Sequence, residues 1–159
     1  MGLCFMKNGF NELSLLLKNI MTITDFTIRL LVALFAGLSI GFERQWHHKA
    51  AGLKTNMLVA TGAAIFVLLS FILKGDESNI DVSRIVAQVV TGVGFLGAGV
   101  IFREGTDVHG LSTAATIWCS AAIGCLAASG MFYETLIATI MVIVINIFLR
   151  PVEKWLNER

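Results

Sequence analysis

Five long apolar segments, separated by short charged stretches, dominate this sequence. A helix that crosses a bilayer needs about 20 predominantly apolar residues. Only 14% of the residues are charged, against about 25% in a typical soluble domain, and the mean hydropathy is +0.79. We therefore predict an all-α membrane protein, a bundle of five transmembrane helices with no soluble domain. The predicted spans are Phe26–Phe42, Asn56–Leu73, Arg84–Phe102, Leu111–Ala128 and Met131–Leu149, with a turn at Ser129–Gly130 between the last two.

These spans divide the 159 residues into three parts. Residues 1–24 form a leader whose short apolar patch, Leu13–Leu17, favours a helix that lies in the membrane interface. Residues 25–150 form the transmembrane domain, and residues 151–159 form a short cytoplasmic tail.

The distribution of lysine and arginine predicts the orientation, because short cytoplasmic loops carry the excess of these residues. With five spans, the first loop, the third loop and the tail lie on one side. That side carries Arg44, Lys49, Lys54, Arg103, Arg150, Lys154 and Arg159. The other side has Arg29, Lys74 and Arg84, with Asp76, Glu77 and Asp81 nearby. We expect an outer N-terminus and a cytoplasmic C-terminus.

A polar stripe runs along the third span. Asp81, Arg84, Gln88 and Thr91 are spaced three, four and three residues apart, which places them on one face of a helix. Charged and polar side chains are costly in lipid and usually face a protein interior. We predict that this face is part of a functional interior.

The first span offers a counterpart to this stripe. Asp25 and Arg29 are four residues apart at the outer end of that span, and the first and third spans run parallel. We predict that the two charge pairs meet in a four-charge cluster below the outer surface. The alternative is that each pair is a local salt bridge at a helix end, with its long side chain reaching for the interface.

Glycines are concentrated where helices are expected to pack. Small residues four apart allow helix backbones to approach closely, so we predict packing positions in the first, third and fourth spans. These are Gly37, Gly41, Gly92, Gly94, Gly97, Gly99 and Gly124. A second interpretation is a locally irregular helix around Gly94–Gly99 that exposes carbonyl groups to an ion.

The first cytoplasmic loop carries a dense polar motif. It comprises Glu43, Arg44, Gly52, Lys54 and Thr55. We predict that Thr55 is the N-cap of the second helix, because its hydroxyl can accept a backbone N–H bond there. The neighbouring His47 and His48 suggest a metal site, but adjacent residues do not share a helix face and no further ligands are evident.

No motif in the sequence indicates catalysis or a cofactor. There is no nucleophile–base arrangement, no metal-ligand spacing and no phosphate-binding loop, and Gly92-Val-Gly94 lies in an apolar helix rather than after a strand. The net charge of +1 and the lack of a long basic run argue against nucleic acid. We expect a non-enzymatic protein whose partners are the lipid bilayer and either other membrane proteins or further copies of itself.

Four stretches, in this order and spacing, resemble the MgtC/SapB (YhiD-like) family of bacterial inner-membrane proteins. They are residues 29–44, 51–66, 83–102 and 110–124, and they cover most of residues 25–149. Lys54 stands where arginine is common in that family, and lysine lacks the planar fork of arginine.

The resemblance implies five membrane helices, an outer N-terminus and a cytoplasmic C-terminus. It also implies adaptation to low magnesium, survival of pathogens inside host cells, and regulation of other membrane proteins. Several members carry a cytoplasmic ACT-like domain after the fifth helix; the sequence ends before one, so functions that need it are not expected. The alternative is a transporter or channel for a small ion or solute, with its pathway lined by the polar face of the first and third helices.

Overall fold

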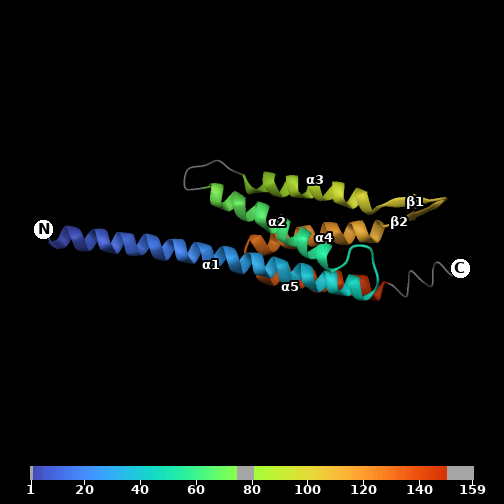
Figure 1. Cartoon of the computed structure of the whole chain (residues 1–159), viewed down its shortest axis with the longest axis horizontal. Coiled ribbons are helices and arrows are strands. Elements are labelled where there is room, and N and C mark those ends of the chain that lie inside the picture. Colours follow the sequence, from blue (N-terminus) through green and yellow to red (C-terminus); the bar gives the residue numbers. More distant parts are fainter. Residues whose placement is uncertain (1, 75–80, 150–159) are drawn as a thin grey trace.

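The computed structural model describes the backbone of residues 2–74 and 81–149, and the side chains of residues 23–73 and 81–149. Within these limits the chain forms five helices and one small hairpin (Figure 1). The elements are α1 (Gly2–Trp46), α2 (Leu53–Lys74), α3 (Val82–Val100), β1 (Phe102–Glu104), β2 (Asp107–His109), α4 (Leu111–Ala128) and α5 (Phe132–Phe148). The predicted tail, residues 151–159, and the charged residues Lys74, Asp76, Glu77 and Arg150 lie outside the described side chains.

The predicted five-helix architecture is confirmed. Four helical segments are long and apolar enough to cross a membrane: Ile23–Trp46, Leu53–Leu73, Val82–Val100 and Leu111–Ala128. The fifth, Phe132–Phe148, is a shorter apolar helix. Apart from the start of α1, each observed boundary lies within about four residues of the predicted one.

The first helix is longer than one span. It continues without a break from Gly2 to Trp46, a length of about 68 Å at 1.5 Å per residue. Figure 1 shows its N-terminal part extending beyond the other four helices. The predicted leader is therefore helical and continuous with the first span.

Helix α4 lies at the centre of the bundle. It packs against α1, α2, α3 and α5, and 56% of its span is buried, against 11% for α3. Alanines make this close approach possible: Ala33, Ala60, Ala64, Ala127 and Ala128 are completely buried. Helix α3 packs against α2 and α4 at the edge of the bundle, whereas α1 packs against α2, α4 and α5.

The turn between α4 and α5 depends on a glycine. Gly130 adopts a positive φ of 78°, and after it the Met131 N–H donates to the Leu126 carbonyl at 3.2 Å. With the Gly130 N–H donating to Ala127 at 3.0 Å, this is a Schellman motif that ends α4. The predicted turn at Ser129–Gly130 is confirmed.

The β-hairpin between α3 and α4 was not predicted. Glu104 pairs with Asp107 across a two-residue loop, and Gly105 in that loop has a φ of 62°, as tight hairpin turns require. All six strand residues are exposed. Figure 1 shows the hairpin projecting from the end of the bundle opposite to the N-terminus.

Candidate functional site

The polar stripe of α3 faces outward in this single chain. Arg84, Gln88 and Thr91 are all exposed, so they do not line the interior of the five-helix bundle as predicted. Thr91 donates its hydroxyl to the Ala87 carbonyl of its own helix at 3.0 Å. The side chain of Gln88 makes no hydrogen bond within the described part of the chain. This leaves an amide group on the outer surface of a membrane helix.

The two charge pairs lie on helices that are separated by α2 and α4. Asp81 is the N-cap of α3, and its carboxylate accepts a hydrogen bond from the Ser83 N–H at 2.9 Å. Arg29 pairs with Asp25 at 2.9 Å on α1. The predicted four-charge cluster is therefore not formed by these described residues, and the alternative of local pairing describes Asp25 and Arg29.

Arg29 also has a function in the bundle that the sequence did not indicate. Its Nη1 donates to the carbonyl of Ala128, the last residue of α4, at 2.8 Å. Its guanidinium carbon lies 6.0 Å from the centre of the Phe71 ring. A cation at a helix C-terminus satisfies a free carbonyl and compensates the helix dipole. Arg29 thus joins α1 to the end of α4.

The predicted packing glycines fall into two groups. A Cβ atom built on Gly37 would lie 2.6 Å from the Asn56 carbonyl oxygen, and one on Gly41 would lie 2.6 Å from Leu53 Cα. A Cβ on Gly124 would overlap the Ala60 carbonyl group. These three glycines let α1 and α4 approach α2, so their predicted role is supported by the geometry.

The glycines of α3 are different. A Cβ on Gly92, Gly94 or Gly99 would meet no atom within 4 Å, and one on Gly97 would be in ordinary contact with Ala114 Cβ at 3.5 Å. Within this chain, α3 therefore uses Gly97 in its contact with α4 and leaves the other three free. The helix is regular from Val82 to Val100, so the interpretation as an irregular helix around Gly94–Gly99 is wrong.

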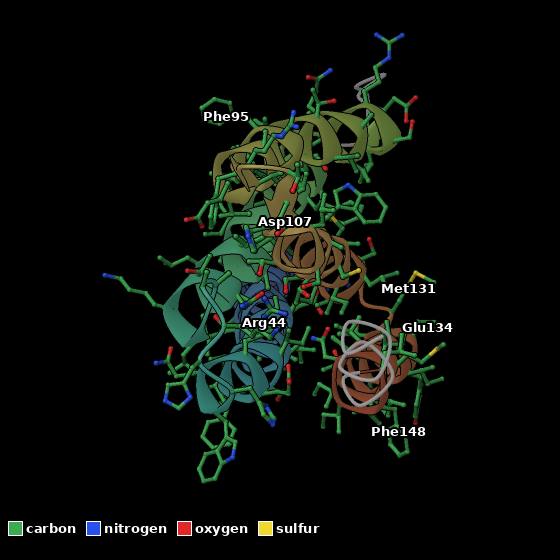
Figure 2. The ribbon with its side chains drawn as sticks, turned by 90° about the vertical axis from the view of Figure 1, so that its right-hand side faces the viewer. Arg44, Phe95, Asp107, Met131, Glu134 and Phe148 are labelled. Atoms are coloured by element: carbon green, nitrogen blue, oxygen red, sulfur yellow. The ribbon has the colours of Figure 1, made fainter. Side chains whose placement is uncertain are left out.

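An apolar groove runs beside this glycine face. It has a volume of about 590 Å³ and lies between α2 and α3. Its walls include Leu58, Gly62 and Phe66 from α2, and Gln88, Gly92 and Phe95 from α3. Figure 2 shows Phe95 pointing away from the other helices. The groove, Gly92 and the amide of Gln88 form one continuous face, which we call the α3 face.

The motif that was predicted to be cytoplasmic lies at the end of α1 and in the loop that follows it. Glu43 is 7% exposed and Arg44 is 2% exposed. Arg44 Nη2 donates to the Thr113 hydroxyl on α4 at 2.6 Å, and Glu43 Oε1 lies 3.1 Å from His47 Nδ1. Figure 2, which looks at the molecule from the hairpin end, shows Arg44 in the interior of the bundle.

The remaining motif residues shape the loop that leads into α2. Gly52 is buried, and a Cβ there would overlap the Gln45 side chain. Lys54 is exposed. The prediction that Thr55 is the N-cap of α2 is wrong, because the helix already begins at Leu53.

Asn56 fixes this loop, although it was not predicted as a functional residue. Its amide donates to the carbonyls of Ala51 and Gly52 at 3.0 and 2.9 Å, and its Oδ1 accepts from the Ser120 hydroxyl at 2.8 Å. An amide in the first turn of an apolar segment was the available signal, because polar groups inside a membrane bundle are usually partnered. In the described part of the chain, no group of three or more His, Cys, Asp or Glu side chains is placed to hold a metal ion.

Comparison with known proteins agrees with the resemblance. Residues 30–155 match the model of the MgtC family. The protein MgtC of Salmonella typhimurium is 50% identical over 138 residues, which is 87% of this chain and 58% of that protein. The protein MgtC of Brucella abortus is 53% identical over 119 residues, or 75% of this chain and 49% of that protein.

A protein of Synechocystis sp. described as uncharacterized is also similar, with 50% identity over 132 residues, or 83% of this chain and 55% of that protein. The chain thus spans about half the length of these curated relatives. No solved structure matches. The match to the family model covers most of the five-helix domain, and the chain belongs to the MgtC family.

Proposed function

We propose that this MgtC-type membrane protein is a non-enzymatic regulator in the bacterial inner membrane. In this proposal it acts by binding a transmembrane helix of another membrane protein on the α3 face, and it serves adaptation to low magnesium and, in a pathogen, virulence. Its N-terminus lies outside and its C-terminus in the cytoplasm. The observation that carries the proposal is the open α3 face.

The depth of Gln88 is the first argument. It lies six residues after Val82, where α3 begins, or about 9 Å along a helix that is about 28 Å long. The hydrocarbon core of a bilayer is about 30 Å thick, so the amide lies well inside it. Lipid offers no hydrogen bond there, whereas a polar side chain of a neighbouring helix does.

The free glycines are the second argument. Glycine in a helix costs about 1 kcal/mol relative to alanine when nothing compensates for it. Gly37, Gly41 and Gly124 are compensated by close packing within the chain, but Gly92, Gly94 and Gly99 are not. A partner helix seated in the groove would supply the missing contact at Gly92, which lines the groove, and small residues are the usual basis of such contacts.

The test compares rescue of a deletion strain in medium of low magnesium. Gly92→Leu and Gln88→Leu should abolish rescue. Both should leave the amount and thermal stability of the protein unchanged, because both positions are exposed within the chain. The matched control is Ser39→Leu, which adds a leucine to an exposed position of α1 and should rescue like wild type. Full rescue by both α3 variants would contradict the proposal.

A photo-crosslinking residue at position 92 identifies the class of partner. A product with another membrane protein, absent when the residue is placed at position 39, is expected. A product that contains only two copies of this chain would favour self-association and contradict the regulation of another protein. Ion flux through liposomes that contain only the purified chain would instead favour the transporter function.

A further inference from the structure

A second cleft opens between the ends of α1, α4 and α5. It has a volume of about 270 Å³, roughly nine times the ~30 Å³ that one water occupies in the liquid. Its polar walls are Glu43 and Arg44 of α1, Lys49 of the following loop, Ser112 and Thr116 of α4, and Asn146 of α5. The cleft is distinct from the α3 face and has room for a small polar group rather than one bridging water.

Two polar atoms in this cleft are buried and have no hydrogen-bond partner among the described residues. They are Glu43 Oε2 and Asn146 Nδ2. The Glu43 side chain is only 6% exposed, and its other oxygen, Oε1, lies 3.1 Å from His47 Nδ1. Buried polar groups are nearly always partnered, and a buried carboxylate oxygen without a donor is especially unfavourable. A group that donates to Glu43 Oε2 and accepts from Asn146 Nδ2 would satisfy both atoms.

The charges around the cleft define that group further. Glu43 supplies one anion, and Arg44 and Lys49 supply two cations. An ammonium group complements the carboxylate, and an anionic group complements the two cations. A ligand that carries both charges a few ångströms apart satisfies the whole set.

The position of the cleft favours an amphiphilic ligand. Helix α1 ends at Trp46, which is 71% exposed and lies 6.0 Å, ring centre to ring centre, from the exposed Phe42. Exposed tryptophan at a helix end marks the headgroup region of the membrane. The wall that α5 contributes is otherwise apolar, with Val142, Ile145 and Leu149, and can accommodate hydrocarbon.

We propose that this cleft binds the phosphoethanolamine headgroup of a membrane phospholipid. The ammonium group donates to Glu43 Oε2, and the phosphate accepts from Asn146 Nδ2 and pairs with Lys49. The acyl chains lie along the apolar side of α5. The site would tie α5 to the end of α1 through a bound lipid.

The experiment measures lipid adducts of the delipidated full chain by native mass spectrometry. The probes are phosphatidylethanolamine, phosphatidylcholine and phosphatidylglycerol with identical acyl chains. The first should bind about tenfold more tightly than the others, a difference that one charge-assisted hydrogen bond readily supplies. Phosphatidylcholine has no N–H donor for Glu43, and phosphatidylglycerol has no cation.

Two variants and one control locate the site. Glu43→Gln should reduce the preference for phosphatidylethanolamine over phosphatidylcholine to about twofold or less, since the carboxylate charge is lost. Lys49→Gln, at an exposed position that does not endanger folding, should weaken phosphatidylethanolamine binding several-fold. Glu104→Gln, the same change on the exposed hairpin, should bind like wild type. Unchanged binding by both cleft variants would overturn the proposal.

Soluble phosphoethanolamine distinguishes a lipid from a free metabolite. It should compete with the lipid only at far higher concentration, because it lacks the acyl chains that contact α5. Equal affinity of the free headgroup would overturn the assignment to a lipid. A preference for phosphatidylglycerol, or no preference among the three lipids, would overturn the assignment to an ammonium headgroup.

Discussion

The hydroxyl of Ser120 on α4 donates to the side-chain oxygen of Asn56 on α2 at 2.8 Å. Both residues are completely buried. Because the Asn56 amide also holds the carbonyls of Ala51 and Gly52, one side chain joins the central helix to the loop after α1. Both N–H groups of this amide and its oxygen thus have a partner, as a buried polar group in a membrane protein requires.

Removing one half of this pair should destabilise the bundle. Ser120→Ala leaves Asn56 Oδ1 buried without a donor, and we expect a loss of about 1 kcal/mol in the free energy of unfolding. Asn56→Ala should cost about 2–3 kcal/mol, because it leaves the Ala51 carbonyl and the Ser120 hydroxyl unpaired and removes one of the two hydrogen bonds to the Gly52 carbonyl. Equilibrium unfolding in detergent micelles measures both changes.

The matched control for this series is Ser39→Ala. The Ser39 hydroxyl is exposed and donates only to the Phe35 carbonyl of its own helix, at 2.9 Å. This variant should retain the stability of the wild type. If Ser120→Ala were equally neutral, the buried pair would not hold α2 against α4.

Two glycine-to-alanine changes should have opposite consequences. Gly124→Ala forces a methyl group into the Ala60 carbonyl, and the shift of α2 away from α4 should cost roughly 1–3 kcal/mol. Gly94→Ala adds a methyl group in open space and should be neutral or stabilise α3 by up to about 1 kcal/mol. Thermal unfolding followed by circular dichroism separates them. A similar loss in both would mean that α3 has a close neighbour at Gly94.

Arg29 should contribute more stability than its ion-pair partner. Arg29→Ala removes the hydrogen bond to the last carbonyl of α4, and we expect a loss of about 1–2 kcal/mol. Asp25→Asn should change stability by no more than about 0.5 kcal/mol, because this carboxylate is 55% exposed and exposed ion pairs contribute little. Unfolding of both variants in the same detergent compares the two losses of stability. A larger loss for Asp25→Asn would show that the ion pair between Asp25 and Arg29 contributes more than the hydrogen bond from Arg29 to the Ala128 carbonyl.

The helices could be predicted from the sequence because each is a long apolar run with charged or glycine-containing ends. Length and hydropathy locate such runs even without any knowledge of their neighbours. Length and hydropathy do not predict which side of a helix faces the other helices, because lipid-facing and protein-facing surfaces are both apolar. For this reason Gln88 and Thr91 were assigned to the interior, although in this chain they are exposed.

The structural roles of two asparagines inside the bundle were not predicted, for a related reason. Asn56 and Asn146 each interrupt an apolar run, which is a signal that an amide needs a partner there. Their partners come from other helices: Ser120 of α4 for Asn56, and Thr116 of α4 beside Asn146 at 3.5 Å. Which helices meet is decided by packing around the small residues of α4, and a single sequence does not contain that information. The hairpin was missed because its strands are only three residues long.

The orientation of the chain gives a final prediction. The hairpin end carries Arg44, Lys49, Lys54 and Arg103, whereas the opposite end carries Arg29, Lys74 and Arg84, and the side with more lysine and arginine is favoured in the cytoplasm. In a variant without native cysteines, Met131→Cys at the opposite end should react with an impermeant thiol reagent in intact spheroplasts. Thr106→Cys in the hairpin should react only after permeabilisation, since the reagent cannot reach it from outside. The reverse pattern would place the hairpin, and with it the end of α5, outside the cell.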